Sequence, residues 1–195
     1  MPTYSYWQSK LINSIGDMTE RLHRIFDAER CRESWLQGEL FLSHRERVDV
    51  NLIPIAGRRT KADLSADLKV ESGHVVRSGL RPMVAELKVL AASFQRKMIT
   101  GGAIKPFRRL PIVNGRRFLT ESDARSLRDG PWGLVPDYLR LLDTEVPPRT
   151  EKLLVLAALT DVDERYDDLK PVHFEAKSFL ERPLGKWGFV RIWRV

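Results

Sequence analysis

Near residue 48 of this chain of 195 residues the period of the hydrophobic pattern changes, and that change constrains the fold more than any other feature. Between residues 11 and 26 the apolar side chains recur at spacings of three and four, which predicts an amphipathic helix. Residues 33–47 are typical of a second helix. From residue 48 to residue 55, and again from residue 62 to residue 70, the period is two, which predicts strands. Helices followed by strands indicate a mixed α/β domain.

Later segments extend this α/β pattern. Apolar runs predict strands over residues 82–90, 152–160 and 187–195, and helices are expected over residues 91–99 and 136–143. The length suits one domain. We therefore expect a single domain, 1–195, with a mixed central β-sheet flanked by helices. Its parts would be a helical N-terminal segment (10–47), a core (48–100), a basic insertion (101–120), and C-terminal helices and strands (121–195).

The composition narrows the class of protein. Apolar residues make up 43% and charged residues 30% of the chain, which is ordinary for a globular protein. No apolar run approaches the ~18–20 residues of a membrane-spanning helix. The N-terminal residues do not form a signal-peptide pattern, so we expect a cytoplasmic protein without membrane partners. The single cysteine, Cys31, cannot form an internal disulfide, and no Cys/His cluster has zinc-binding spacing.

Positive charge is concentrated in one part of the sequence. The formal net charge is +7, but residues 1–120 contain 21 cations against 12 anions. From residue 87 to residue 120 there are eight cations and no anion. Such a field attracts a polyanion such as a nucleic acid, but a solvated loop can have the same basic composition, so the charge alone leaves both open. The eight cations are Lys88, Arg96, Lys97, Lys105, Arg108, Arg109, Arg116 and Arg117.

Two predicted strands carry charged residues that could form a site. In the strand over residues 82–90, period two places Glu86 and Lys88 on one face and Leu87 on the other. In the preceding strand, Asp63 and Asp67 also share a face. Charges on a core strand are costly unless they are paired or hold a metal. If the two strands are neighbours, their carboxylates suit a hard divalent cation such as Mg²⁺, and the lysine could serve an attacking water.

Other acid-x-Lys triplets leave alternatives open. The chain contains four such triplets, whereas random pairing of its residues gives roughly 1.3. Only the triplet at Glu86 lies on an apolar strand, after an acid-bearing strand and ahead of the basic segment. A shifted register would use Asp49 with the triplet from Asp67 to Lys69. Another arrangement would pair the triplet from Glu175 to Lys177 with Asp167 or Asp168.

Three segments together resemble the PD-(D/E)XK nuclease superfamily, which has the restriction-endonuclease-like fold. The stretch ESWLQGELFLSHRER resembles the first core helix, in which a glutamate often reaches the metal site, and Glu39 is the best candidate. RRTKADLSADL resembles the strand with the first catalytic aspartate, best matched by Asp63. MVAELKVL resembles the strand with the paired acid and lysine, Glu86 and Lys88. The family's proline before the aspartate is replaced here by Ala62.

The resemblance implies a restriction-endonuclease-like core and hydrolysis of phosphodiester bonds with Mg²⁺ or Mn²⁺, and a DNA endonuclease is expected. The implied catalytic residues are Asp63, Glu86, Lys88 and Glu39, and the implied metal ligands are Asp63 or Asp67, Glu86 and the carbonyl of Leu87. A homodimer or a larger protein complex is compatible with this assignment. Nucleic acid is expected at the helix AASFQRKM and the basic insertion, through Gln95, Arg96, Lys97, Lys105, Arg108, Arg109, Arg116 and Arg117.

The sequence leaves two other functions open. One is a non-catalytic nucleic-acid-binding module on the same fold, whose binding would need no metal and would weaken with salt. The other is an assembly protein whose basic face meets an acidic partner.

Overall fold

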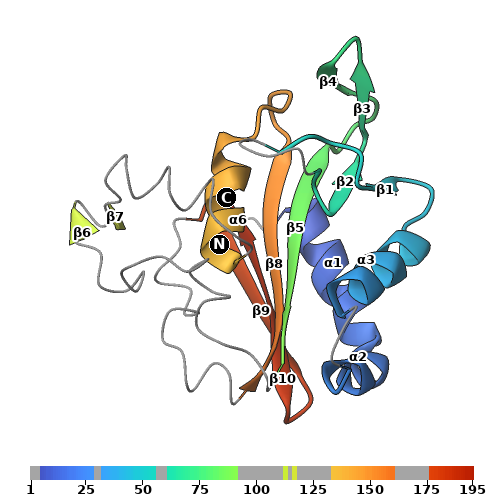
Figure 1. Ribbon diagram of the computed structural model, residues 1–195, viewed down its shortest axis with the longest axis vertical. Helices are drawn as coiled ribbons and strands as arrows, with labels where there is room; N and C mark the ends of the chain where they lie inside the picture. Colours follow the sequence, from blue (N-terminus) through green and yellow to red (C-terminus); the bar gives the residue numbers. More distant parts are fainter. Residues whose placement is uncertain are drawn as a thin grey trace.

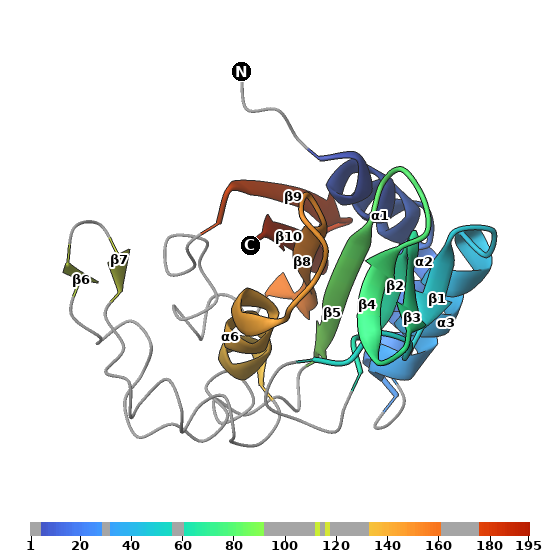
Figure 2. The same ribbon diagram turned by 90° about the horizontal axis from the view of Figure 1, so that it is seen from above.

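In the computed structural model, a six-stranded sheet is covered by helices on both faces (Figure 1). The structure describes residues 5–28, 32–55, 61–91, 133–160 and 176–195, together with the backbone of residues 112–113 and 116–117. Figure 2 shows the helices between residues 6 and 43 on one side of the sheet and the helix of residues 134–143 on the other. The helices are α1 (Tyr6–Asp17), α2 (Thr19–Phe26), α3 (Arg32–Ser43) and α6 (Leu134–Asp143).

The sheet is mixed, as the sequence predicts. Its order is β1-β2-β5-β8-β10-β9, and every neighbouring pair is antiparallel except β5 with β8. A parallel pair needs a long crossover, and the segment that joins β5 to β8 contains α6. The strands of this sheet are β1 (Val48–Val50), β2 (Leu64–Ala66), β5 (Met83–Leu90), β8 (Glu151–Leu159), β9 (Ser178–Leu184) and β10 (Gly188–Arg194). Two hairpins add β3 (Leu68–Glu71) with β4 (His74–Arg77), and β6 (Ile112–Val113) with β7 (Arg116–Arg117).

Strand β5 lies between the two halves of the hydrophobic core, and all eight of its residues are buried. Leu87 and its same-face neighbours pack with the cluster under α1, α2 and α3. Val84 and Leu90 belong to the cluster that includes α6. Since side chains alternate along a strand, Glu86 and Lys88 face α6. The predicted placement of these two residues on one face is therefore confirmed.

Several predicted elements are confirmed: α3, β5, α6, β8 and β10 lie where the hydrophobic pattern places them. The single helix expected over residues 11–26 is wrong, because the chain breaks at Met18 into α1 and α2. There the Thr19 hydroxyl donates to the Gly16 carbonyl at 2.6 Å, in competition with the helical backbone. Strand β9 was not expected; it is a half-exposed edge strand that contains Pro183, so its pattern is weak.

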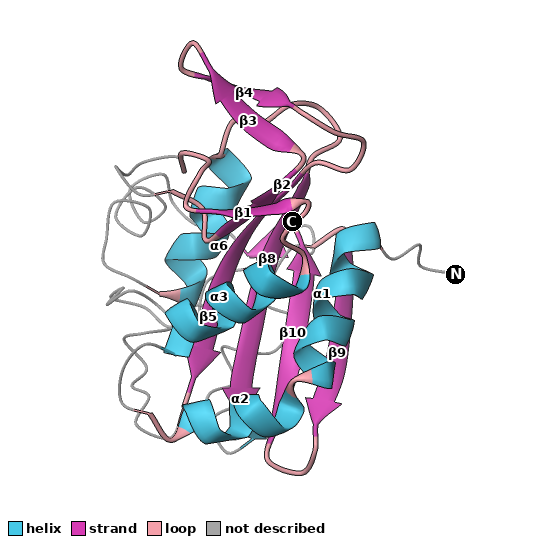
Figure 3. Cartoon of the chain, turned by 90° about the vertical axis from the view of Figure 1, so that its right-hand side faces the viewer, coloured by secondary structure: helices cyan, strands magenta, loops and turns pink. Residues whose placement is uncertain are grey.

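The single strand expected over residues 62–70 is also wrong, because Asp67 interrupts it. Asp67 has a left-handed φ of 53°. Its carbonyl accepts hydrogen bonds from the backbone N–H groups of Ser78 (2.8 Å) and Gly79 (3.3 Å). A Cβ at Gly79 would lie 2.4 Å from the Asp67 carboxyl carbon, so a larger residue there would displace this carboxylate. The β3–β4 hairpin consequently projects away from the sheet (Figure 3).

Among the described residues, none of the helices combines the length and the apolar character needed to span a membrane.

Candidate functional site

The N-terminal end of β2 brings an aspartate against β5. Strand β2 begins at Leu64, opposite Ala85, so within the described chain the later part of β5 has no strand partner at this edge. Asp63 substitutes for that partner, since its Oδ2 accepts the Leu87 backbone N–H at 2.7 Å. The Gln37 side chain donates to the Asp63 carbonyl at 2.6 Å and ties the same point to α3. Asp63 is thus held beside the acid-x-Lys triplet by contacts from two elements.

Glu86 is a buried carboxyl group with an unsatisfied oxygen. Its side chain points into the α6 side of the sheet, and the residue is only 7% exposed. Its Oε1 atom is buried and has no hydrogen-bond partner in the described part of the chain. Burial, and after it the charge of Asp63, raise the pKa of Glu86 to about 8. A buried oxygen without a partner is costly, which marks this atom as a candidate ligand.

The pKa of Asp63 is raised as well. Burial raises the pKa of its carboxyl group, although the hydrogen bond from Leu87 and the charge of Lys88 oppose the shift. Two neighbouring carboxyl groups therefore share a site in which their ionised forms are destabilised. An excess of buried negative charge is the arrangement that a bound cation would relieve.

Lys88 is the cation of the site and is held by three oxygens. Its Nζ lies 2.8 Å from Asp137 Oδ2, 3.3 Å from Glu33 Oε2 and 3.2 Å from the Leu87 carbonyl. Asp137 is 1% exposed, and its other carboxylate oxygen accepts a hydrogen bond from Arg140. Because Glu33 lies in the first turn of α3 and Asp137 lies in α6, helices from both layers meet at this ammonium group.

Sequence reasoning missed Glu33, Asp137 and Arg140. A sequence signal existed for two of them, because Asp137 and Arg140 are charged residues at a spacing of three inside an otherwise apolar helix. For α3, the expected residue was Glu39, but its carboxylate lies 2.7 Å from Arg21. Glu39 lies six positions after Glu33 in the helix, which rotates its side chain by roughly 240° relative to that of Glu33. The structure therefore brings Glu33, and not Glu39, to Lys88.

Asp67, the alternative first ligand, lies at the other end of β2. Its carboxylate forms an ion pair with Arg47 and accepts the Arg81 backbone N–H at 2.7 Å. The alternative site, made of Asp49 and the triplet from Asp67 to Lys69, does not form either. Lys69 instead pairs with Glu71 at 2.6 Å on the exposed hairpin. Several predicted positions lie outside the described residues: Gln95, Arg96, Lys97, Lys105, Arg108, Arg109, Asp167, Asp168 and Glu175. For Arg116 and Arg117 only the backbone, in β7, is described.

The site offers oxygen ligands for a hard cation. Asp63 and Glu86 supply carboxylates, and Leu87, which directly follows Glu86, supplies a backbone carbonyl. In the described part of the chain, no cluster of three or more His, Cys, Asp or Glu residues suits a metal ion. The unpartnered Glu86 oxygen and the raised pKa values nevertheless fit a divalent cation, for which carboxylate and carbonyl oxygens are the preferred ligands.

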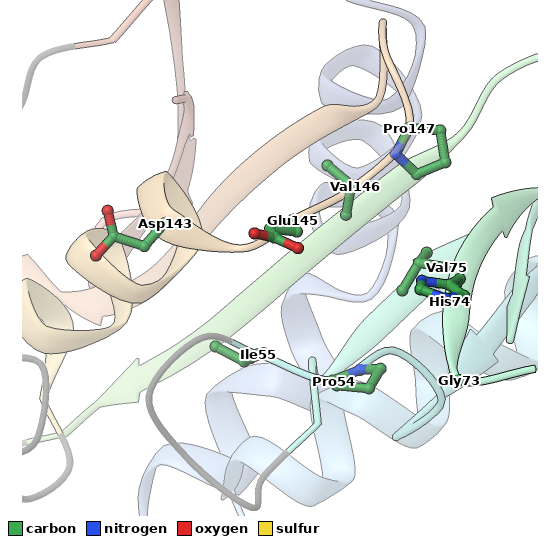
Figure 4. Close-up of a pocket in the computed structure, with 9 residues that line it drawn as sticks. All are labelled: Pro54, Ile55, Gly73, His74, Val75, Asp143, Glu145, Val146 and Pro147. Carbon is green, nitrogen blue, oxygen red and sulfur yellow. The ribbon is translucent and has the colours of Figure 1, made fainter.

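A pocket lies apart from Asp63 and Glu86. It measures about 580 Å³ and is lined by residues 54–55, by the β3–β4 hairpin, and by the end of α6 and the connection to β8. Figure 4 shows Glu145 and Val146 on one side of it, with Pro54 and Ile55 on the other. None of its lining residues belongs to the Glu86–Lys88 site.

Comparison with protein-family models, with curated proteins and with solved structures finds no match for this chain.

Proposed function

We propose that this protein is a metal-dependent nuclease with a restriction-endonuclease-like core, and that it hydrolyses phosphodiester bonds in DNA. The observation that carries the proposal is the juxtaposition of Asp63 and Glu86, two carboxyl groups with raised pKa values, beside Lys88. The segments that resemble this superfamily correspond to α3, β2 and β5, which meet at these residues.

The cation expected at this site is Mg²⁺ or Mn²⁺, held by Asp63 and Glu86 with the Leu87 carbonyl beside them. When bound, it would lower the pKa of a coordinated water and stabilise negative charge on a phosphoryl oxygen. Asp63 has a second role, since its bond to the Leu87 N–H keeps this stretch of β5 in place. Glu86 contributes an oxygen that has no hydrogen-bond partner among the residues that the structure describes.

Lys88 supplies a positioned positive charge. Asp137 restrains its ammonium group from α6, and Glu33 approaches from α3 with a side chain that is 44% exposed. A preorganised donor of this kind stabilises charge that develops in the transition state, because it needs no reorganisation when the reaction occurs. We assign this role to Lys88, toward a phosphoryl oxygen of the substrate.

Plasmid cleavage in the presence of Mg²⁺ or Mn²⁺ tests the proposal. The variants Glu86→Gln and Lys88→Met should lose cleavage. Two matched controls come from the exposed β3–β4 hairpin, where Glu71→Gln and Lys69→Met make the same chemical changes away from the site. These controls should cleave like the wild type. Cleavage that survives both site substitutions would exclude this assignment.

A non-catalytic nucleic-acid-binding module is the second candidate. It is favoured by one observation, namely that Lys88 is already paired with two carboxylates. A module of this kind would bind nucleic acid without metal and would be indifferent to Glu86→Gln. Binding assays in EDTA, run beside the cleavage assay, separate the two functions.

A further inference from the structure

A second, smaller groove lies at the other end of α3 from Glu33. It measures about 250 Å³ and is formed by the first turns of α1 and by residues 42–47. In Figure 3 the N-terminal end of α1 and the C-terminal end of α3 lie near each other, on the face of the sheet that α1, α2 and α3 cover. Its polar lining includes Tyr6, Lys10, His44, Arg45 and Arg47.

Three cations converge on the ring of Tyr6. The Cζ atoms of Arg81 and Arg47 lie 4.1 Å and 5.4 Å from the ring centroid, and Lys10 Nζ lies 5.7 Å from it. Cation–π attraction holds these groups together at a modest gain of ~0.5–1 kcal/mol for an exposed pair. Because these cations gather around the ring, the groove presents positive charge.

This positive charge is only partly compensated. Arg47 is paired with Asp67, and Glu46 is an exposed anion on the rim. Lys10 and Arg45 are exposed and form no ion pair with any described residue. His44 does not offset this positive charge. Burial and the charge of Lys10 lower the pKa of His44, which favours its neutral ring. Unpaired cations that converge on a groove attract an anionic ligand.

We propose that this groove binds backbone phosphates of a nucleic-acid strand that extends from the Asp63–Glu86–Lys88 site, an inference that rests on the proposed function. Helix α3 links the two places, since Glu33 at its first turn contacts Lys88 and Ser43 at its end lines the groove. Ten residues of helix span about 15 Å. That distance corresponds to roughly four to five base pairs at 3.4 Å each. Contacts of this kind would position the substrate without reading its sequence.

The test measures how affinity for a labelled DNA duplex depends on salt, with EDTA present so that no cleavage occurs. The double variant Lys10→Gln/Arg45→Gln removes the two unpaired cations. Its control, Arg24→Gln/Lys186→Gln, removes two exposed cations near α2 and the β9–β10 turn, at the far end of the molecule in Figure 1. The loss of two phosphate contacts should reduce the slope of log K against log salt by about 1.8. The control should keep the wild-type slope.

The outcomes separate this inference from the proposed function. A reduced slope in the groove variant alone supports the groove, even if no cleavage is found. Cleavage by the wild type, with equal slopes in all three proteins, overturns the groove and leaves the nuclease assignment intact. The groove is also overturned if the wild type binds no DNA at low salt, or if an acidic peptide such as polyglutamate binds with the slope change expected for DNA. Circular dichroism confirms that each variant is folded.

Discussion

Asp63 and Asp67 flank the same three-residue strand, β2, yet their surroundings are opposite in character. At the C-terminal end, Asp67 is compensated by Arg47 and by the Arg81 N–H, and it holds the turn that begins the β3–β4 hairpin. At the N-terminal end, the half-buried Asp63 lies beside the buried Glu86, and the pKa values of both are raised. A carboxylate whose charge is satisfied by the protein stabilises the fold. A pair whose charge is left in excess points to a ligand.

The largest expected effect is a difference in cleavage rate between variants at Asp63 and at Asp67. Asp63→Asn removes a negative ligand from the site and should lower cleavage by about 10²–10³-fold, the scale on which single catalytic groups act. Asp67→Asn should leave the rate of cleavage by folded protein unchanged. Initial rates on plasmid with Mn²⁺ measure both, corrected for the folded fraction. Equal losses in the two variants would remove the functional distinction between them.

Next in size is the dependence of stability on pH at Glu86. Its pKa rises from an ordinary value of 4.5 to about 8 in the folded protein, so the folded state keeps a proton that the unfolded state releases. The wild type should therefore lose stability relative to Glu86→Gln as the pH rises from about 4.5 to about 8, at up to about 1.4 kcal/mol per pH unit. Above that window the difference should stay constant.

Denaturant titrations at several pH values measure this difference. Glu71→Gln, which removes an exposed carboxylate, is the matched control and should show no such trend. Added Mn²⁺ should raise the stability of the wild type more than that of Glu86→Gln, because a ligand that binds only the folded state stabilises it. Parallel curves for the wild type and Glu86→Gln would contradict the uncompensated burial of Glu86.

A smaller effect is expected from Asp137, which positions Lys88 and does not itself lie among the proposed metal ligands. Asp137→Asn should lower the cleavage rate by ~10–100-fold, as do other groups that orient a reactive side chain. The change should appear in kcat and not in KM. It should also alter the pH profile of cleavage, which a loss of folded protein alone would not do. An unchanged profile with a proportional loss of folded protein would make Asp137 purely structural.

The smallest expected effect is on stability at the compensated end of β2. Asp67→Asn weakens the contact with Arg47 and should lower the free energy of unfolding by ~1–3 kcal/mol. Gly79→Ala should act in the same direction, because its methyl group would collide with the Asp67 carboxylate. Thermal and denaturant unfolding measure both. A neutral result for both variants would show that this turn does not depend on Asp67.

Much of the site was predictable from local pattern. Alternation along β5 placed Glu86 and Lys88 on one face, and the same reasoning placed an acid-bearing strand ahead of them. The choice between Asp63 and Asp67 was not predictable, because a continuous strand would put both on one face. The contacts that break the strand at Asp67 come from Arg47, Ser78 and Gly79, which are distant in sequence.

The sequence by itself determined a buried strand with an acid-x-Lys triplet, because strand periodicity is set by backbone geometry over a few residues. Only the tertiary structure decided which acids surround Lys88. Glu33 lies 55 positions before it and Asp137 lies 49 positions after it, and each arrives on a helix from a different layer. Charge compensation depends on distance in space and on burial, and neither is encoded in the spacing of residues along one strand.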